Sequence, residues 1–214
     1  MPLGLSRAAV IAPSARELDA FRVTFEQDHC IQVRGFMQAE LLAWIRSHVR
    51  ADRFVRRVHR DLVPPAVDDV MKDEALSAKL FMLLNASALF RTVEAITGCD
   101  PIGSYYPTVF RLDPDSGHGD AWHDDLDGNR LVAMSVNLGE AYEGGVLQLR
   151  DASTLRVLSE VHNDGPGDAV LFRISPALQH RVTPVTGTRA RLTMTGWFLR
   201  TPKAGPDWPR RLGG

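Results

Sequence analysis

The second half of this chain reads as a series of short strands separated by turn sequences, and this limits the folds open to it. From Tyr105 onward, runs rich in β-branched and aromatic residues alternate with turns such as Gly144-Gly145 and Asp164-Gly165-Pro166-Gly167. Strands are predicted near residues 105–112, 131–138, 145–150, 155–161, 168–174, 180–185 and 189–199. Such a run of short strands after a helical half predicts an α+β protein, a two-sheet β-sandwich backed by helices.

The first half has the periodicity of helices. Ser14 and Glu17 form a capping-box pattern at the start of one helix, and residues 41–49 have the apolar spacing of a second. The apolar residues of 76–93 predict a single longer helix that ends near Gly98. Cys30–Val33 is predicted to be a short strand between helices.

An arginine-rich segment, Arg53–Pro65, lies between the predicted helices. We interpret it as a solvated loop that ends at the paired prolines Pro64 and Pro65. The alternative is a lid or a contact for an acidic substrate.

Length and composition indicate a single globular domain over residues 1–214, in which 1–100 are mainly helical and 101–200 form the β-rich core. The hydrophobic fraction of 44% and formal charge of -1 give no reason to expect nucleic acid or a membrane as partner. Neither a secretion signal nor a membrane span is recognisable, and the two cysteines are expected to stay reduced. A cytoplasmic location is therefore predicted.

Three residues of the β-rich half form a candidate metal site. If His123 and Asp125 stand on a strand, their side chains share one face, because strand side chains alternate with a period of two. His180 begins a later strand-like run and is the candidate third ligand. Two imidazoles and one carboxylate can occupy one face of an octahedral metal and leave three positions open. The spacing would equally serve zinc or manganese, and Asp124 is an alternative to Asp125.

Other histidines are less suited to this role. His162 lies in a predicted turn, His118 lies in a loop, and the rest belong to the helical half. His180 remains the best partner because a strand holds a ligand rigidly.

Taken together, blocks of this half resemble the 2-oxoglutarate/Fe(II)-dependent dioxygenases, in particular the prolyl-hydroxylase-like branch, over roughly Tyr105 to Arg200. The blocks, in chain order, are His123-x-Asp125, Val136-Asn137-Leu138, Glu143–Leu149, Gly167–Phe172, His180–Val185, and Arg191 with Trp197. The resemblance implies a double-stranded β-helix, a cupin-like jelly roll, with Fe(II) held by His123, Asp125 and His180. It also implies 2-oxoglutarate as cosubstrate, O₂, and ascorbate as a reductant.

The resemblance implies further site residues. The basic residue that binds the remote carboxylate of the cosubstrate should be Arg191, six residues before Trp197, with Arg189 as the rival. Arginine suits the role because its planar fork matches a carboxylate. Thr193 shares the strand face of Arg191 and is expected to contribute a hydroxyl.

Two aromatic positions are open to more than one interpretation. Tyr106 is expected to contact the same carboxylate as Arg191, although Phe110 could stand in the usual tyrosine position. Trp122 could shape the substrate mouth or simply pack.

The implied activity is hydroxylation of an unactivated C–H bond of a small metabolite, amino acid or peptide, with release of succinate and CO₂. A carboxylate at Asp125 matches hydroxylases, since halogenating relatives leave that position without a ligand. The alternatives are a metal-dependent dioxygenase that uses no keto acid and a catalytically silent jelly-roll binding module. Dependence on the cosubstrate separates the first alternative, and metal content the second. The oligomeric state is left open.

Overall fold

The computed structural model of the chain describes residues 3–59, 66–114 and 121–202. The helices are α1 (Ala15–Asp28), α2 (Ala39–His48), the 3-10 turn η1 (Ala51–Arg53), α3 (Glu74–Leu84) and α4 (Ser87–Thr97). The N-terminal half also holds the strands β1 (Gly4–Leu5), β2 (Val10–Ile11), β3 (Cys30–Val33), β4 (Phe54–His59) and β5 (Ala66–Met71). The C-terminal half holds β6 (Ser104–Leu112), β7 (Arg130–Asn137), β8 (Glu143–Gly144), β9 (Leu147–Asp151), β10 (Val157–Val161), β11 (Ala169–Arg173), β12 (Leu178–Val182), β13 (Val185–Thr186) and β14 (Arg191–Leu199).

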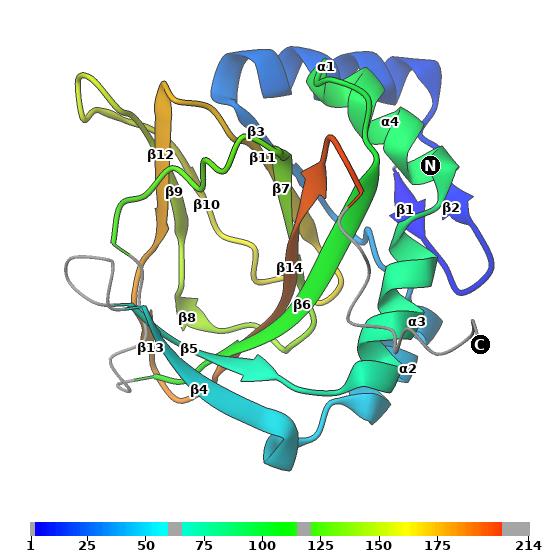
Figure 1. Ribbon diagram of the computed structural model, residues 1–214, viewed down its shortest axis with the longest axis vertical. Helices are drawn as coiled ribbons and strands as arrows, with labels where there is room; N and C mark the ends of the chain where they lie inside the picture. Colours follow the sequence, from blue (N-terminus) through cyan, green and yellow to red (C-terminus); the bar gives the residue numbers. More distant parts are fainter. Residues whose placement is uncertain (1–2, 60–65, 115–120, 203–214) are drawn as a thin grey trace, which may run out of the picture.

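Two facing sheets form the core of the described structure. The larger has the strand order β3-β11-β7-β14-β6-β5-β4, and the smaller has the order β10-β9-β12, with the pair β13-β8 at one end. All neighbours in these sheets that are paired along their length run antiparallel. In Figure 1 the helices lie along the large sheet on the side away from β9, β10 and β12. The predicted jelly roll backed by helices is confirmed.

Helices α3 and α4 replace the single long helix that was predicted. The chain leaves the helix at Asn85, and the two axes are bent by 63°. The Asn85 side chain donates to the backbone oxygen of Tyr105 and accepts from its nitrogen, both at 2.9 Å. It therefore pairs with the edge of β6 much as a neighbouring strand would. The end of α4 at Gly98, in left-handed backbone with φ of 63°, is as predicted.

Strand β4 corrects the prediction of a loop at residues 53–65, of which 60–65 lie outside the described residues. β4 pairs with β5, and Arg56 and Arg57 stand directly opposite Asp69 and Asp68. Nε of Arg56 lies 3.1 Å from a carboxylate oxygen of Asp69, and Nη2 of Arg57 lies 2.8 Å from one of Asp68. Cross-strand pairs of opposite charge favour the strand pairing, so the arginines belong to a hairpin and not to a loop.

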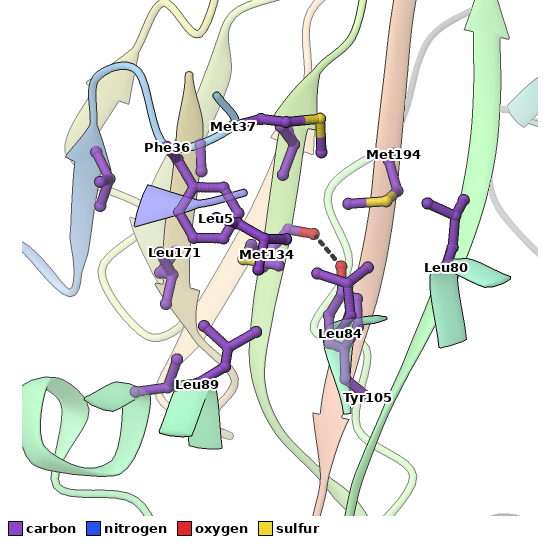
Figure 2. Packing of buried hydrophobic residues seen from close by; sticks show 14 of the residues in the cluster. Leu5, Phe36, Met37, Leu80, Leu84, Leu89, Tyr105, Met134, Leu171 and Met194 are labelled. Atoms are coloured by element: carbon purple, nitrogen blue, oxygen red, sulfur yellow. Dashed lines mark hydrogen bonds between the residues drawn. The ribbon is translucent and has the colours of Figure 1, made fainter. Parts of the chain in front are cut away.

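The main hydrophobic cluster fills the space between the helices and the large sheet. Leu80, Leu84 and Leu89 of the helices pack against Met134 and Met194 of the central strands, as Figure 2 shows. In the same cluster the buried hydroxyl of Tyr105 donates to the backbone oxygen of Met134 at 3.2 Å. The cluster thus covers the central strands on the helix side of the large sheet.

Among the described helices, none alone has the length and hydropathy needed to cross a membrane. The bent pair α3 and α4 would pass both criteria together, and the leucines at 76, 80, 84 and 89, with Val93 and Ile96, are buried in the core.

Both cysteines are free thiols with raised pKa values. Burial raises the pKa of Cys30 to about 11 and also raises the pKa of Cys99. Since the thiolate is the reactive form, Cys30 in the folded protein should be alkylated by iodoacetamide at pH 8 on the order of 100-fold more slowly than in urea. Peptide mass spectrometry over a time course measures both rates. Equal rates would mean that Cys30 is not buried in solution.

Candidate metal centre and adjoining cavity

The structure brings His123, Asp125 and His180 together between the two sheets. One potential ligand atom from each lies within 4.8 Å of the other two. Nε2 of His180 is 3.3 Å from Oδ2 of Asp125, and Nε2 of His123 is 3.8 Å from Oδ1. Ligands at right angles about one ion, each about 2.1 Å from it, lie about 3.0 Å apart. The three side chains are thus within small adjustments of a shared ion.

Backbone pairing fixes the relation of the two histidines. His180 lies in the middle of β12, and His123 forms an isolated bridge with it: each backbone nitrogen donates to the other's oxygen, at 3.1 and 2.8 Å. The Nδ1 of His123 lies 2.8 Å from the backbone oxygen of Ala121. If Nδ1 donates there, Nε2 is left to bind a metal, an arrangement common to metal-bound histidines.

Asp125 reaches the site in a different way from the one predicted. Residues 124–129 are not a strand, and Asp125 has a left-handed backbone with φ of 60°. The strand alternation expected for His123 and Asp125 is therefore wrong, although the two side chains do converge. The alternative ligand Asp124 turns elsewhere, since its Oδ1 accepts from the backbone nitrogen of Leu126.

Two further side chains hold the Asp125 carboxylate. Trp197 donates its indole N–H to Oδ2 at 2.8 Å, and Arg130 donates to Oδ1 at 2.7 Å. Burial raises the pKa of this carboxyl. The hydrogen bond and charge of His180, with the charges of His123 and Arg130, outweigh this effect and lower the pKa to about 2. The carboxylate is ionised at neutral pH, as a metal ligand must be.

A cavity of about 490 Å³ adjoins this cluster. Its walls are largely apolar: Leu147 comes from the small sheet, and Phe110, Val170, Phe172 and Trp197 come from the large sheet. The ring of Phe172 also packs on the ring of His180, with centroids 4.7 Å apart. Such a concave, mostly apolar space with a few polar groups is typical of small-ligand sites.

Arg191 provides the cation of this cavity that has no acidic partner. Its side chain is buried; Nε donates to the hydroxyl of Tyr142 at 3.2 Å and Nη2 to that of Ser135 at 3.4 Å. Within the described residues it makes no ion pair with a carboxylate. A buried guanidinium without a counter-ion favours an anionic ligand. The rival Arg189 is exposed and precedes β14.

Two buried polar atoms of the cavity lining also lack partners among the described residues. They are Oγ1 of Thr193 and Oδ1 of Asn163. Buried polar groups are rarely left unpaired in native proteins, so a polar ligand or water in the cavity would satisfy them. The donor set, the unpaired cation and these two atoms fit a divalent metal with an anionic organic ligand beside it.

The structure does not bring Tyr106 to this group. Tyr106 pairs with Trp197 in the β6–β14 register, whereas Arg191 pairs with Leu112. Six strand positions, about 20 Å of backbone, separate the two pairs. The ring of Tyr106 contacts Phe81 near α3 instead. The prediction that Tyr106 shares a ligand with Arg191 is therefore wrong, and the alternative, Phe110, does line the cavity.

Several residues of the site were missed from the sequence. Tyr142, Ser135 and Asn163 converge on Arg191 from three separate segments: the hydroxyl of Tyr142 donates to the backbone oxygen of Asn163 at 3.0 Å, and the Asn163 amide donates to that of Ser135 at 3.1 Å. Arg130 was also missed. Only Arg130 lies near a predicted ligand in the chain, so proximity to Asp125 was the one available signal.

Residues 108–199 match the family model of the 2OG-Fe(II) oxygenase superfamily. No curated protein matches the chain in sequence. The fold resembles that of an oxidoreductase of the 2OG-Fe(II) oxygenase family from Burkholderia pseudomallei, at a TM-score of 0.66 and 17% identity, over 94% of this chain and 98% of the other. It also resembles a prolyl-4-hydroxylase from Pseudomonas putida, at 0.63 and 22% identity, over 86% and 99% of the two chains.

A third similar structure is the epimerase SnoN, solved with Fe³⁺, α-ketoglutarate and nogalamycin RO. It has a TM-score of 0.62 and 15% identity, over 87% of this chain and 84% of the other.

The fold and the site together define a jelly-roll protein with a candidate metal centre of two histidines and one aspartate. The 2OG-Fe(II) oxygenase family model spans residues 108–199, and this stretch holds His123, Asp125, His180 and Arg191. By these likenesses the site is a candidate centre for Fe(II) and 2-oxoglutarate.

Proposed function

We propose that the protein hydroxylates an unactivated C–H bond and that one cavity holds all the required groups. The observation that carries the proposal is that the metal cluster and the unpaired Arg191 line the same cavity. Fe(II) would be bound by His123, Asp125 and His180. The remote carboxylate of 2-oxoglutarate would pair with Arg191 and accept from the hydroxyl of Thr193.

The chain's own residues bind, orient and shield in this proposal. When bound, Fe(II) with 2-oxoglutarate supplies the oxidising chemistry that consumes O₂ and releases succinate and CO₂. Trp197 and Arg130 keep the Asp125 carboxylate in place, and Tyr142 and Ser135 orient the Arg191 guanidinium. The apolar wall around Phe172 and Leu147 limits water beside the metal.

Hydroxylation is proposed over other outcomes because the aspartate is in place. Halogenating members of the superfamily lack a carboxylate at this position, and Asp125 occupies it here. The similar structures include both a prolyl-4-hydroxylase and an epimerase, so the fold alone does not choose the outcome.

The substrate is proposed to be a small metabolite, a free amino acid or a short peptide. A cavity of about 490 Å³ falls in the range that ordinary small-molecule ligands fill, so cosubstrate and the reacting part of a small substrate both fit. An acidic or carrier-bound substrate finds less support, because Arg56 and Arg57 are each paired with an aspartate.

The test is turnover of 2-oxoglutarate. Purified protein with Fe(II), ascorbate and O₂ should produce succinate slowly even without substrate, and the His180→Ala variant should produce none. In the absence of O₂, adding Fe(II) and 2-oxoglutarate together should give a visible ligand-to-metal absorption band. If the protein binds metal but shows neither readout, a dioxygenase that uses no keto acid would be favoured. If it binds no metal, a binding module would be favoured.

Once turnover is established, the substrate can be sought by incubating the protein with a metabolite extract under ¹⁸O₂. The product is expected to gain one labelled oxygen, and mass spectrometry would identify it. A product that loses two hydrogens and gains no oxygen would replace hydroxylation with desaturation.

A further inference from the structure

Trp122 lies next to a metal-cluster residue but not in the cavity. Its neighbour His123 lines the cavity, whereas Trp122 is absent from the lining and packs against two arginines. The guanidinium carbon of Arg150 is 4.3 Å from the centre of the indole ring, and that of Arg181 is 4.6 Å away. We call these three side chains the Trp122 clamp. Guanidinium groups at such distances are attracted to the ring face.

The two arginines of the clamp are fixed to the small sheet. Arg150 of β9 donates twice to Oε1 of Gln179 on β12, at 2.9 and 2.6 Å. Arg181 of β12 donates to Oε1 of Gln148 on β9, at 2.7 Å. In the described parts of the chain neither arginine pairs with a carboxylate, so no acid competes with the indole for the two cations.

Within the described residues, few other contacts connect the segment that the clamp holds to the sheets. His123 makes only an isolated bridge with β12, and Asp125 follows in left-handed backbone outside any strand. On its C-terminal side this segment is tied down by Trp197 and Arg130 through the Asp125 carboxylate. On its N-terminal side the Trp122 clamp makes the corresponding connection, to the same strand that carries His180.

We propose that Trp122 is a positioning residue for the metal centre: packed against Arg150 and Arg181, it holds His123 against β12 so that the ligand atoms are in place before the metal binds. The proposal rests on the metal site of the proposed function, and it goes beyond that function by giving a role to residues outside the cavity. Replacing a residue that orients a metal ligand without binding the metal itself typically weakens metal binding by about 10- to 100-fold.

The test is a titration of the metal-free protein with Co²⁺, whose visible absorption reports both occupancy and coordination geometry. Trp122→Ala should weaken Co²⁺ binding about 10-fold and alter the band shape. Trp122→Phe, which keeps a ring face, should restore most of the affinity. Replacing Arg150 and Arg181 together with methionine should reproduce the loss, and this variant carries the test if Trp122→Ala does not fold.

Trp44 provides a matched control. Its ring also has two cations nearby, Arg7 at 5.6 Å and Lys79 at 5.5 Å, but it lies on α2 in the helical layer. Trp44→Ala should lower thermal stability and leave Co²⁺ affinity unchanged. Unchanged affinity in Trp122→Ala, or an equal loss in Trp44→Ala, would overturn the proposal while the wild-type protein still binds metal. A wild-type protein that binds no Co²⁺ would instead overturn the metal site and the proposal with it.

Discussion

Replacing Asp125 with glycine is expected to weaken Fe(II) binding by more than about 100-fold, beyond the effect usual for residues behind the ligands. The change removes the one anionic ligand, which has a pKa lowered to about 2 and is ionised throughout the working pH range. Glycine accepts the left-handed backbone of this position without strain, so the loss reports on the ligand itself. Anaerobic titration with Fe(II) measures the affinity, and succinate formation should fall with it.

The control for this experiment is Asp124→Asn. Asp124 has the same charge and is adjacent in the chain, but its carboxylate accepts from the backbone of Leu126 and lies outside the cluster. Its replacement should leave Fe(II) affinity within about twofold, since this half-buried carboxylate is not one of the cluster's ligand groups. A larger loss in Asp124→Asn than in Asp125→Gly would mean that the two aspartates exchange roles in solution.

Replacing Arg191 with alanine is expected to raise the dissociation constant for 2-oxoglutarate by about 30-fold or more. Removing one partner of a buried, hydrogen-bonded charge pair costs roughly 2 kcal/mol or more, and each 1.4 kcal/mol corresponds to about 10-fold. Fe(II) affinity in the absence of 2-oxoglutarate should change little, because Arg191 contacts Tyr142 and Ser135 and none of the three metal-cluster residues. The visible band of the anaerobic complex, titrated with 2-oxoglutarate, gives the constant directly.

Two comparisons sharpen this second experiment. Arg189→Ala, at an exposed position just before β14, should bind 2-oxoglutarate as the wild type does. Arg191→Lys keeps the charge but loses the planar fork, and it should fall between wild type and alanine. Equal effects of Arg191→Ala and Arg189→Ala on the dissociation constant would show that Arg191 is not the residue that binds the cosubstrate.

The strands of the β-rich half were predictable because alternating burial and glycine turns leave a strong local signal. The helix break at Asn85 was not, because its cause is a pairing with Tyr105, twenty residues further along the chain. The hairpin β4–β5 was hidden by its arginines, which look solvated until the aspartates on the opposite strand are seen. In each case a partner distant in sequence decided the local structure.

The candidate site divides in the same manner. His123, Asp125, His180 and Arg191 were found because their spacing resembles a family pattern, and the structure places all four on one cavity. The error with Tyr106 came from its distance to His123 along a loop of irregular length, which says nothing about register in the sheet. Asn163 could not be recognised, because a turn-forming residue in sequence becomes a buried one only through the path of the chain. The cytoplasmic location stays a prediction.

The left-handed backbone of Asp125 restricts which residues can replace it in evolution or design. At φ of 60° glycine, asparagine and aspartate are the residues best suited, whereas a β-branched side chain would strain the main chain. Asparagine and glycine are therefore the replacements for Asp125 that this backbone accepts most readily. In the proposed metal centre, aspartate at position 125 fills one coordination position and glycine would leave it open. The backbone at this position accepts both residues.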